Sequence, residues 1–506
     1  MAIIGNIIKA VIDLKGTISQ SNPIEEQKQV LIDLLEEAKN TAFGKHYNFQ
    51  EILNDENPQN KFSQSIPQHD YETMKDQWWH KVIAGQSDIT WPGRPDYFAL
   101  SSGTTGNESK RIPVTKAMVD SIRQAGIDQV FSLTNFNFPA DFFEKEVLML
   151  GSSTNLVEKD DHLEGEISGI STSNIPDWFN GYCKPGEEIT KIDDWDSRVK
   201  KIAEKAKDWD IGVLSGIPSW LELILEEIIA YHQAETIHDI WPNLQVFTSG
   251  GTSFSPYEKS FKKLLARPIT IIDTYLASEG FIAFQARPET DSMKLITDNG
   301  IYFEFVPFQP EYLKSDGSIS DDAPSLTLAE VELDQDYILI ISTLSGAWRY
   351  LIGDTIAFTD IERAEIIITG RTKFFLNTVG SQLSVNKLDS AVKHLEDNLD
   401  ASIPEYTVSA KRFGEDFYHS WYLGSNMSEV DNDKIADELD KYLSAANKNY
   451  SVARSKALAG VKVNVVSPSV FQEWSSAKKK KGGQVKMERV MGADKFEEWE
   501  TFVKNN

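Results

Sequence analysis

Helical stretches alternate with short, almost continuously apolar runs along most of this chain, and this alternation limits its fold more than any other feature. Residues 147–150, 245–248 and 269–272 are runs of this kind, with helical patterns between them. Strands that are apolar on both faces are typical of sheets covered by helices on both sides. The pattern therefore predicts an α/β fold built in layers.

The texture of the sequence changes after residue 370. Before this point lies a β-rich patch that runs from residues 301–305 to residues 337–341. We expect a large N-terminal domain over residues 1–370 and a small α+β C-terminal domain over residues 371–506. The small domain is expected to contain helices near 385–399 and 433–446 and strands near 406–410, 420–423 and 461–466.

The first clear helix is expected over residues 23–42. Asn22 is a suitable N-cap, Pro23 suits the first helical position, and Glu25 stands where a capping box places an acid. Gly44 follows the apolar stripe of this helix and is expected to end it.

The charge balance restricts the partners of the protein. Its 506 residues include 51 Lys+Arg and 77 Asp+Glu, which gives a net charge of −26. A surface this acidic repels phosphate backbones and anionic membranes, so neither a nucleic acid nor a membrane is expected as a partner. An anionic ligand would need a site that is locally positive.

Cysteine content and hydropathy indicate the compartment. Cys183 is the only cysteine, which excludes an internal disulfide and fits a reducing environment. No uncharged apolar run comes near the roughly 18 residues that a membrane span needs. We therefore expect a soluble, cytoplasmic protein.

Several common signatures are missing from the sequence. It has no metal-helix histidine spacing, no G-x-S-x-G elbow, no Walker lysine loop and no G-x-G-x-x-G after a strand. These absences argue against a structural metal, a serine hydrolase, a P-loop NTPase and a Rossmann dehydrogenase.

A loop rich in hydroxyl groups follows an expected strand at residues 97–100. Its glycines let backbone N–H groups turn inward and its hydroxyls add donors, which suits a triphosphate. Thr115 can cap a helix that begins at Lys116. A solvated loop is the alternative interpretation. The loop contains Ser101, Ser102, Gly103, Thr104, Thr105 and Gly106, and Lys110 and Arg111 follow it.

A second motif joins a glycine pair, Gly250 and Gly251, to a strand expected over residues 269–272, which delivers Thr274 and Tyr275 and, beyond them, Ser278 and Glu279. A tyrosine face can stack on a purine, and a carboxylate beside a triphosphate can bind Mg²⁺. The alternative is a strand-end turn with a core tyrosine and a solvated glutamate.

In the next two motifs a charged residue follows a glycine: an aspartate in the first and an arginine in the second. Asp354 follows Gly353 at an expected strand end, where its carboxylate can accept both hydroxyls of a ribose, although Gly-Asp is also a common turn. Arg371 follows Gly370 at the change of texture. Its guanidinium can reach ribose or phosphate at a hinge, or it is an ordinary interdomain arginine.

A glycine-flanked lysine, Lys486, lies near the C-terminus after Gly482 and Gly483. On a mobile loop it can enter an active site and neutralise developing charge. The alternative is a flexible basic tail, and the lysine run at residues 478–481 is best interpreted as solvated charge.

The order and spacing of these five motifs resemble the adenylate-forming superfamily of acyl-CoA synthetases, adenylation domains and luciferases. Within it, the chain resembles the auxin-responsive acyl acid–amido synthetases of the Gretchen Hagen type. The resemblance covers essentially the whole chain. It rests on residues 27–44, on the loop leading to Lys110-x-Ile112-Pro113-x-Thr115, on Tyr275-x-x-Ser278-Glu279, on Arg349-Tyr350-x-x-Gly353-Asp354, and on Phe471-x-x-Trp474 with Gly483-Gln484-x-Lys486.

The resemblance implies a fold and a reaction. The fold would be a large N-terminal domain with a β-barrel and α/β sheets, followed by a small mobile C-terminal domain. The enzyme would activate a carboxylic acid with ATP and Mg²⁺, giving an acyl-adenylate and pyrophosphate. The amine of an amino acid would then displace AMP to form an amide. Attack at phosphorus brings two anions together, so such a site mainly supplies positive charge and alignment.

The resemblance also implies roles for individual residues. Tyr275 would border the adenine, Asp354 would bind the ribose and Glu279 would ligate Mg²⁺. Arg371 would lie at the hinge, and Lys486 would serve adenylation. The phosphates would be held by Ser101, Ser102, Thr104 and Thr105, and the wider nucleotide-binding set would add Gly103, Gly250, Gly251, Thr274 and Ser278.

Two departures from the family pattern bear on activity. Ser381 and Gln382 stand where the family usually places an acid and a lysine, which removes one expected phosphate contact. Glu488 replaces a common proline two positions after Lys486, where its charge is expected to lower the local positive potential.

Two other functions compete with the amido synthetase. One is an acyl-CoA ligase, in which coenzyme A takes the acyl group. The other is a protein that binds a nucleotide or an acyl group but has lost catalysis, as the two departures suggest. Residues 119–130 and 214–220 are expected either to line the acyl pocket or to pack in the core.

Overall fold

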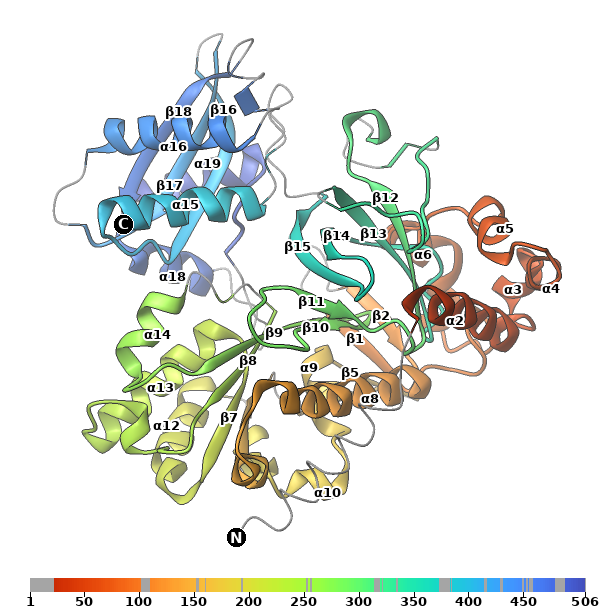
Figure 1. The fold of residues 1–506 in the computed structure, drawn as a ribbon, viewed down its shortest axis with the longest axis horizontal. Coiled ribbons are helices and arrows are strands. Elements are labelled where there is room, and N and C mark those ends of the chain that lie inside the picture. Colours follow the sequence, from red (N-terminus) through yellow and green to blue (C-terminus); the bar gives the residue numbers. More distant parts are fainter. Residues whose placement is uncertain are drawn as a thin grey trace.

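The computed structural model describes residues 22–101, 110–151, 154–159, 161–192, 194–251, 254, 257–313, 319–320, 322–333, 335–372, 383, 385–413, 416–427, 431–447, 450–451, 454, 458–477 and 487–505. These residues form three sheets, each packed against helices (Figure 1). The predicted α/β fold is confirmed. Among the described residues, no helix combines the length and the apolar character needed to cross a membrane.

The main sheet contains eleven of the described strands and changes character at β9 (Thr270–Ala277). On one side of β9 every pairing is parallel, and on the other side every pairing is antiparallel. The parallel side continues through β8 (Val246–Gly250), β7 (Ile211–Gly216), β3 (Glu146–Leu150) and β6 (Cys183–Lys184). The antiparallel side continues through β10 (Gly280–Phe284), β11 (Met293–Leu295), β15 (Glu365–Arg371), β14 (Tyr350–Asp360), β13 (Asp336–Thr343) and β12 (Ile301–Pro307).

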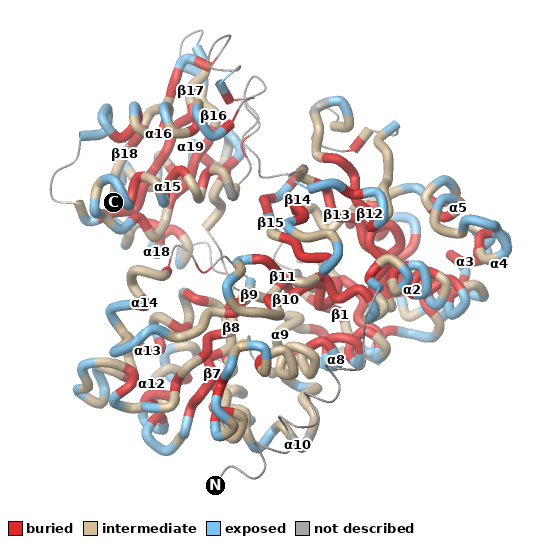
Figure 2. Tube along the Cα trace, in the orientation of Figure 1, coloured by how far each residue is buried: buried red, intermediate tan, exposed pale blue. Residues whose placement is uncertain are grey.

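Both faces of the parallel half are covered, as its apolar strands require. One face packs against α12 (Trp195–Lys205), α13 (Pro218–His232) and α14 (Glu258–Leu264) through a core that includes Leu214, Ile224 and Phe247. The opposite face buries Val213, Val246 and Ile272 against the segment after α8 (Lys116–Ser132). Buried residues accordingly concentrate in the sheets, and exposed ones lie on the outer faces of the helices (Figure 2).

A smaller sheet lies beside the antiparallel half. Its order is β2 (Lys110–Val114), β1 (Tyr97–Ser101), β5 (Leu163–Gly165) and β4 (Val157–Glu158). Helix α8 follows β2 directly, and the Thr115 side chain accepts a hydrogen bond from the Met118 backbone N–H. The predicted strand and the predicted cap are therefore both confirmed.

The first predicted helix is shorter than expected. Helix α2 (Pro23–Ala38) begins at the predicted cap, since the Asn22 side chain accepts from the Ile24 and Glu25 backbone N–H groups. Its end was predicted wrongly. The Thr41 side chain caps a separate helix, α3 (Ala42–His46), and Gly44 lies inside α3 rather than ending α2. A Cβ on Gly44 would lie 2.2 Å from the Ala38 carbonyl oxygen, so close approach explains this glycine.

Gln27 fastens α2 to the main sheet. Its buried amide donates to the backbone oxygens of Thr297 and Ile301 at 2.8 and 2.9 Å and accepts from the Phe303 backbone N–H at 2.7 Å. We expect Gln27→Leu to leave three buried backbone groups unpaired and to lower the free energy of unfolding by about 3 kcal/mol. Denaturant titration measures this change. Gln29→Leu, at an exposed position of the same helix, is the control and should change little.

The C-terminal part forms a third sheet covered on both faces. Its strands β16 (Glu405–Phe413), β17 (Asp416–Gly424) and β18 (Leu458–Val466) confirm three predicted strands. Helices α15 (Val385–Leu399) and α16 (Asn432–Ala446), also predicted, share one core with the sheet. The opposite face packs against α18 (Pro468–Ala477) and α19 (Ala493–Asn505), which were not predicted.

The C-terminal sheet and its helices lie beside β15 and α14 (Figure 1). The Lys259 ammonium group on α14 donates to the Ala401 backbone oxygen at 3.0 Å, so the two parts are in direct contact. The expected β-barrel, the mobility of the C-terminal domain and the boundary at residues 370 and 371 stay predictions.

Candidate functional site

The end of β9 and the turn that follows it place two of the predicted residues. Strand β9 extends to Ala277, five residues beyond its predicted end, so Tyr275 lies inside it. Ser278 and Glu279 form the tight turn to β10, because Gly280 pairs with Ala277 in the register of the two strands. Tyr275 and Glu279 are buried, whereas Ser278 is half-buried. A solvated glutamate, the alternative interpretation, is thus contradicted.

Asp354 lies within β14 and not at a strand end, which corrects the prediction. The register between β13 and β14 shifts opposite residues 351–355, so β14 bulges there. Gly353 adopts φ +88°, which favours glycine, and its backbone oxygen accepts from the Thr372 N–H at 2.8 Å. A bulge changes the direction in which a neighbouring side chain points. Asp354 is buried and faces across the sheet rather than into solvent.

Asp354 joins residues from distant strands. Its Oδ2 accepts a hydrogen bond from the Tyr275 hydroxyl, and its Oδ1 accepts from Arg371 Nε at 2.5 Å. Strands β9 and β14 are four positions apart in the sheet, which would be roughly 19 Å in a flat sheet. The Tyr275–Asp354 bond therefore shows that the main sheet curls strongly between these strands. Three predicted site residues meet at this curl.

Glu279 shares the electrostatic environment of this cluster. Burial raises the pKa of Glu279 to about 7, Asp354 adds to the shift, and the cations Lys110 and Arg371 oppose it. Burial and the Glu279 carboxylate together raise the pKa of the Tyr350 hydroxyl well above its ordinary value. Sequence reasoning gave Tyr350 no role, although it lies four residues before Asp354 in the same motif and that spacing was a usable signal.

The donor set around Glu279 can be compared with the needs of Mg²⁺. Within the described ranges, no three His, Cys, Asp or Glu side chains gather as a metal cage. Mg²⁺ is commonly held by one or two carboxylates together with substrate phosphates and water. Glu279, with Asp354 nearby, fits an ion that arrives with a polyphosphate and does not fit a resident metal.

The glycine pair lies at the carboxyl end of β8, beside β9. Gly250 pairs with Thr274 in the parallel register, and a Cβ on Gly250 would lie 2.8 Å from Thr274 Oγ1. The Thr274 hydroxyl donates to the Ser249 backbone oxygen at 2.9 Å. Gly251 adopts φ +78°, which favours glycine. Ligands of open α/β sheets bind at such carboxyl ends, where the strand order changes.

The two ends of the hydroxyl-rich loop also reach this region. Ser101 ends β1 and pairs with Lys110, the first residue of β2, and the charge of Lys110 acts on Glu279. Ser101 and Lys110, which flank the loop, are therefore fixed next to one another at the ends of β1 and β2. Ser102, Gly103, Thr104 and Thr105, together with Ser381, Gln382 and Lys486, lie outside the described residues.

The chain after Lys486 is anchored on the C-terminal sheet. The Thr407 hydroxyl donates to the Glu488 backbone oxygen at 2.8 Å, and the Val408 N–H donates to the Arg489 backbone oxygen at 2.8 Å. The Glu488 carboxylate pairs with Lys495 at 2.6 Å. Lys495 thus compensates the charge of Glu488. This pairing argues against the expectation that Glu488 lowers the local positive potential.

Arg489, which is partly buried, reinforces this anchor. Its guanidinium bonds Glu405 at 2.8 Å and lies 4.6 Å from the centre of the Tyr406 ring. Burial lowers and Glu405 raises its pKa, with a net rise above the ordinary arginine value. Sequence reasoning missed this residue, whose only signal was its position three residues after Lys486.

The cluster as a whole combines acceptors, cations and an aromatic ring at the carboxyl end of β9. A carboxylate and a buried tyrosine can hold a nucleoside, while the cations Lys110 and Arg371 can compensate the charge of its phosphates. Such a site can align two anions and compensate their charge, which is the main requirement for attack at phosphorus.

Comparison with known families gives matches over much of the chain. Residues 18–203 match the GH3 family N-terminal domain, residues 294–369 match the GH3 family central domain, and residues 386–495 match the GH3 family C-terminal domain. The matched ranges contain Glu488, Asp354 and the β1–β2 loop, whereas Tyr275 and Glu279 lie between the first two ranges.

Two similar plant proteins illustrate the relationship. Indole-3-acetic acid-amido synthetase GH3.8 of Oryza sativa subsp. indica is 27% identical over an alignment of 294 residues that covers 54% of this chain and 47% of the relative. The chain thus spans about half the length of that relative. Indole-3-acetic acid-amido synthetase GH3.2 of Arabidopsis thaliana is 22% identical over 407 residues, covering 67% of this chain and 72% of the relative.

Solved structures share the fold over nearly the whole chain. A GH3.15 acyl acid amido synthetase superposes with a TM-score of 0.76 at 16% identity, covering 98% of this chain and 96% of the other. A 2-hydroxyisobutyryl-CoA ligase in the postadenylation state superposes with a TM-score of 0.58 at 12% identity, covering 94% and 91%. The fold of this chain is therefore that of adenylate-forming enzymes.

Proposed function

The chain belongs to the GH3 family of acyl acid-amido synthetases, and from this premise we propose that it activates a carboxylic acid with ATP and transfers the acyl group to the amine of an amino acid. The observation that carries the proposal is the meeting of Tyr275, Asp354 and Arg371 beside Glu279 at the curl of the main sheet. This cluster offers the contacts that a nucleotide and its metal need.

In the proposed first half-reaction, a carboxylate oxygen of the acid attacks the α-phosphorus of ATP. An O–P bond forms, the bond to the leaving pyrophosphate breaks, and an acyl-adenylate results. In the second half-reaction the amine attacks the acyl carbonyl carbon, AMP leaves with the bridging oxygen, and the amine loses a proton. No covalent enzyme intermediate is needed, so the protein contributes mainly alignment and charge compensation.

The ribose contact is proposed to involve an exchange of partners. Both carboxylate oxygens of Asp354 already accept hydrogen bonds, one from Tyr275 and one from Arg371. Arg371 is half-exposed whereas Tyr275 is buried, so Arg371 is the partner that can move aside. The two ribose hydroxyls would take its place on Asp354, and the freed guanidinium would turn to phosphate.

The remaining nucleotide contacts follow from position. Gly250, Gly251 and Thr274 would border the base next to Tyr275, and Ser278 would lie at the edge of the same turn. Ser101, Ser102, Gly103, Thr104 and Thr105 would surround the phosphates with backbone and hydroxyl donors. Glu279 would hold Mg²⁺, which supplies charge compensation at the phosphates when bound.

The C-terminal domain is proposed to bring Lys486 to the acyl acid and the phosphate. The anchor at Glu488 and Arg489 supports this, because it fixes the chain two residues after Lys486 to β16. We place the division between the domains at residues 370 and 371 and propose that the small domain moves about Arg371 between the half-reactions. The single cysteine, Cys183, fits action in the reducing cytoplasm.

The proposal is tested by following pyrophosphate release with a panel of carboxylic acids and then by detecting amides with a panel of amino acids. We expect release that depends on the acid and on Mg²⁺, followed by amide formation. Formation of AMP that requires coenzyme A and ignores amino acids would instead favour an acyl-CoA ligase, the second candidate, which the fold likeness to 2-hydroxyisobutyryl-CoA ligase supports.

A third candidate, a binding protein without catalysis, predicts stabilisation by nucleotide without turnover. It was motivated by Gln382 and Glu488. Because Glu488 pairs with Lys495, its charge no longer argues for this candidate, and only Gln382 does. Any acid-dependent pyrophosphate release would exclude the candidate.

A further inference from the structure

The curl of the main sheet depends on one very short strand. Strand β11 has three residues and is the link between β10 and β15 in the described sheet. It pairs with β15 through Met293 and Lys294, and with β10 through Lys294 and Leu295. Strand β11 pairs with each of its neighbours over only two residues, so these pairings alone give little resistance to separation of β10 from β15. The halves that carry Tyr275 and Asp354 therefore need another connection.

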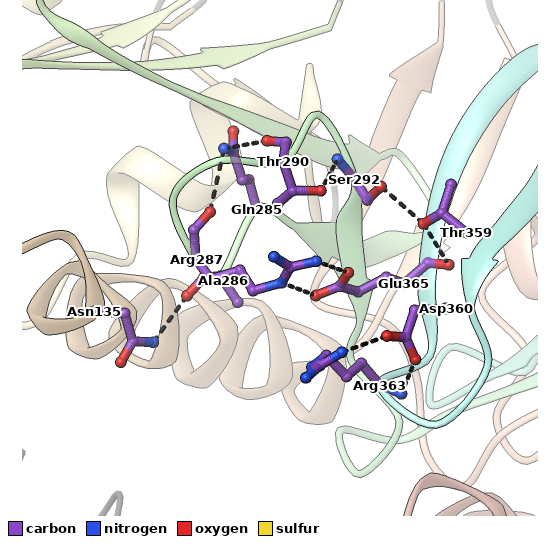
Figure 3. Close-up of polar contacts among 10 residues, drawn as sticks. All are labelled: Asn135, Gln285, Ala286, Arg287, Thr290, Ser292, Thr359, Asp360, Arg363 and Glu365. Carbon is purple, nitrogen blue, oxygen red and sulfur yellow. Dashed lines mark hydrogen bonds and ion pairs between the residues drawn. The ribbon is translucent and has the colours of Figure 1, made fainter.

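The segment that joins β10 to β11, residues 285–292, supplies this connection, and we call it the clasp (Figure 3). The clasp begins on β9: the Gln285 backbone N–H donates to the Asp273 oxygen at 2.9 Å, and the Gln285 side-chain oxygen accepts from the Asp273 N–H at 3.3 Å. Asp273 is two residues before Tyr275. The first end of the clasp is thus fixed beside the nucleotide cluster.

The clasp is held in one conformation by its own polar contacts. The Gln285 amide nitrogen donates to the backbone oxygens of Thr290, at 2.6 Å, and Arg287, at 3.3 Å. The Asn135 amide, in the segment that follows α8, donates to the Ala286 backbone oxygen at 2.9 Å. Figure 3 shows the Gln285 contacts within the loop and the Asn135 contact that reaches it from a neighbouring element.

The second end of the clasp is hydrogen-bonded to the β14–β15 hairpin. Arg287 donates from Nε and Nη2 to the two oxygens of Glu365, each at 2.7 Å, and the two side chains point directly at one another in Figure 3. The Thr359 and Ser292 hydroxyls bond at 2.8 Å. Glu365 is 4% exposed and is the first residue of β15, the strand that ends at Arg371. A bidentate pair fixes orientation as well as distance.

We propose that Arg287 is a positioning residue for the nucleotide site, acting through Glu365 to hold the curl at which the Tyr275 hydroxyl meets Asp354. The path runs from β9 through Gln285 and the clasp to β15, and each non-covalent step along it is a hydrogen bond between described residues. Among the contacts of the described residues, none joins Arg287 to Tyr275, Asp354 or Arg371. Arg287 therefore acts indirectly, by fixing the position of Glu365 and of strand β15. The proposal rests on the proposed function only in requiring that the protein binds ATP.

The test compares Arg287→Met with Arg363→Met. Arg363 belongs to the same hairpin and pairs with Asp360 three residues away, so it does not bridge the two halves of the sheet (Figure 3). We measure the Kd of a non-hydrolysable ATP analogue with Mg²⁺. Arg287→Met should raise it about tenfold, the change that corresponds to losing one well-placed hydrogen bond to the nucleotide. Arg363→Met should leave it unchanged, as should the Kd of the carboxylic acid in both variants.

A second readout separates positioning from general loosening of the fold. In a Tyr275→Phe background the Tyr275–Asp354 bond is already lost, so Arg287→Met should add little further loss of analogue binding. Full additivity of the two substitutions, or an unchanged Kd in Arg287→Met, would overturn the proposal. If Arg287→Met does not fold, Arg287→Lys carries the test, because it keeps the charge but loses the bidentate geometry and should show a smaller loss in the same direction.

The outcomes also distinguish this proposal from the proposed function. A wild-type protein that does not bind the ATP analogue would refute the function. Wild-type binding with unimpaired binding by Arg287→Met would refute only the role of the clasp.

Discussion

Asp354→Asn is expected to reduce kcat/KM for ATP in acid-dependent pyrophosphate release by roughly 100-fold. The substitution keeps the shape of the side chain but removes the negative charge that accepts hydrogen bonds from Tyr275 and Arg371. A ribose that binds through two hydroxyls would lose two charge-assisted bonds, at about 1.5 kcal/mol each. This loss corresponds to roughly two orders of magnitude in rate. We expect most of it in KM.

The matched control for this variant is Asp360→Asn. Asp360 belongs to the same strand, but its carboxylate pairs with Arg363 away from the cluster. It should leave the kinetics unchanged. The thermal midpoint of both variants must be recorded, because Asp354 is buried and its replacement also disturbs Arg371. Near wild-type KM for ATP in Asp354→Asn would exclude this residue from ribose binding.

Lys486→Ala is expected to slow adenylation by about 100-fold to 1,000-fold, the range seen when one stabilising donor is removed from a reacting centre. The lysine would compensate charge that develops as the carboxylate attacks phosphorus. Its contribution is therefore larger in the transition state than in the bound state, and the Kd of the ATP analogue should change little. Rapid-quench measurement of acyl-adenylate formation gives the rate.

The control for Lys486 comes from the neighbouring lysine run. Lys478→Ala removes an equal charge from the same basic segment and should have no effect if that run is solvated charge. Transfer from preformed acyl-adenylate to the amine should be normal in Lys486→Ala, since the first half-reaction alone uses the lysine. An adenylation rate equal to that of the wild type would remove Lys486 from the mechanism.

Local chemistry explains which parts of the fold could be predicted from sequence. Asn22 and Thr115 were predicted as helix caps and are confirmed, because a cap depends on residues within the same turn. The predicted strands and helices of the C-terminal domain are confirmed for a similar reason, since hydrophobic periodicity is a local signal. The prediction that Gly44 ends a helix was wrong because this glycine serves a contact between two helices. The Ala38 carbonyl oxygen lies where a side chain at position 44 would be.

Contacts between distant segments explain the rest. The single large sheet, its change from parallel to antiparallel pairing and the curl that joins Tyr275 to Asp354 depend on strand order, which no local pattern contains. Strand β11 has three residues, too few to show periodicity. Arg287 and Glu365 are separated by 78 residues and carry no spacing signal, although they form the bidentate pair of the clasp.

Gln27 is an intermediate case. It precedes Val30, Leu31 and Leu34 at helical spacing, so it lies on the buried stripe of α2 rather than on the solvent face. A polar residue at such a position predicts a hydrogen-bonded anchor, and the structure provides the three backbone partners. This signal was present in the sequence and was not used.

The central claim is that the acid is activated as an acyl-adenylate before it is joined to an amine. A carboxylic acid labelled with the heavy oxygen isotope in its carboxyl group tests this directly. The attacking oxygen becomes the bridge to phosphorus and leaves with AMP, so mass spectrometry should find one labelled oxygen in AMP and none in pyrophosphate. Label in inorganic phosphate, or amide formation without labelled AMP, would contradict the proposed function.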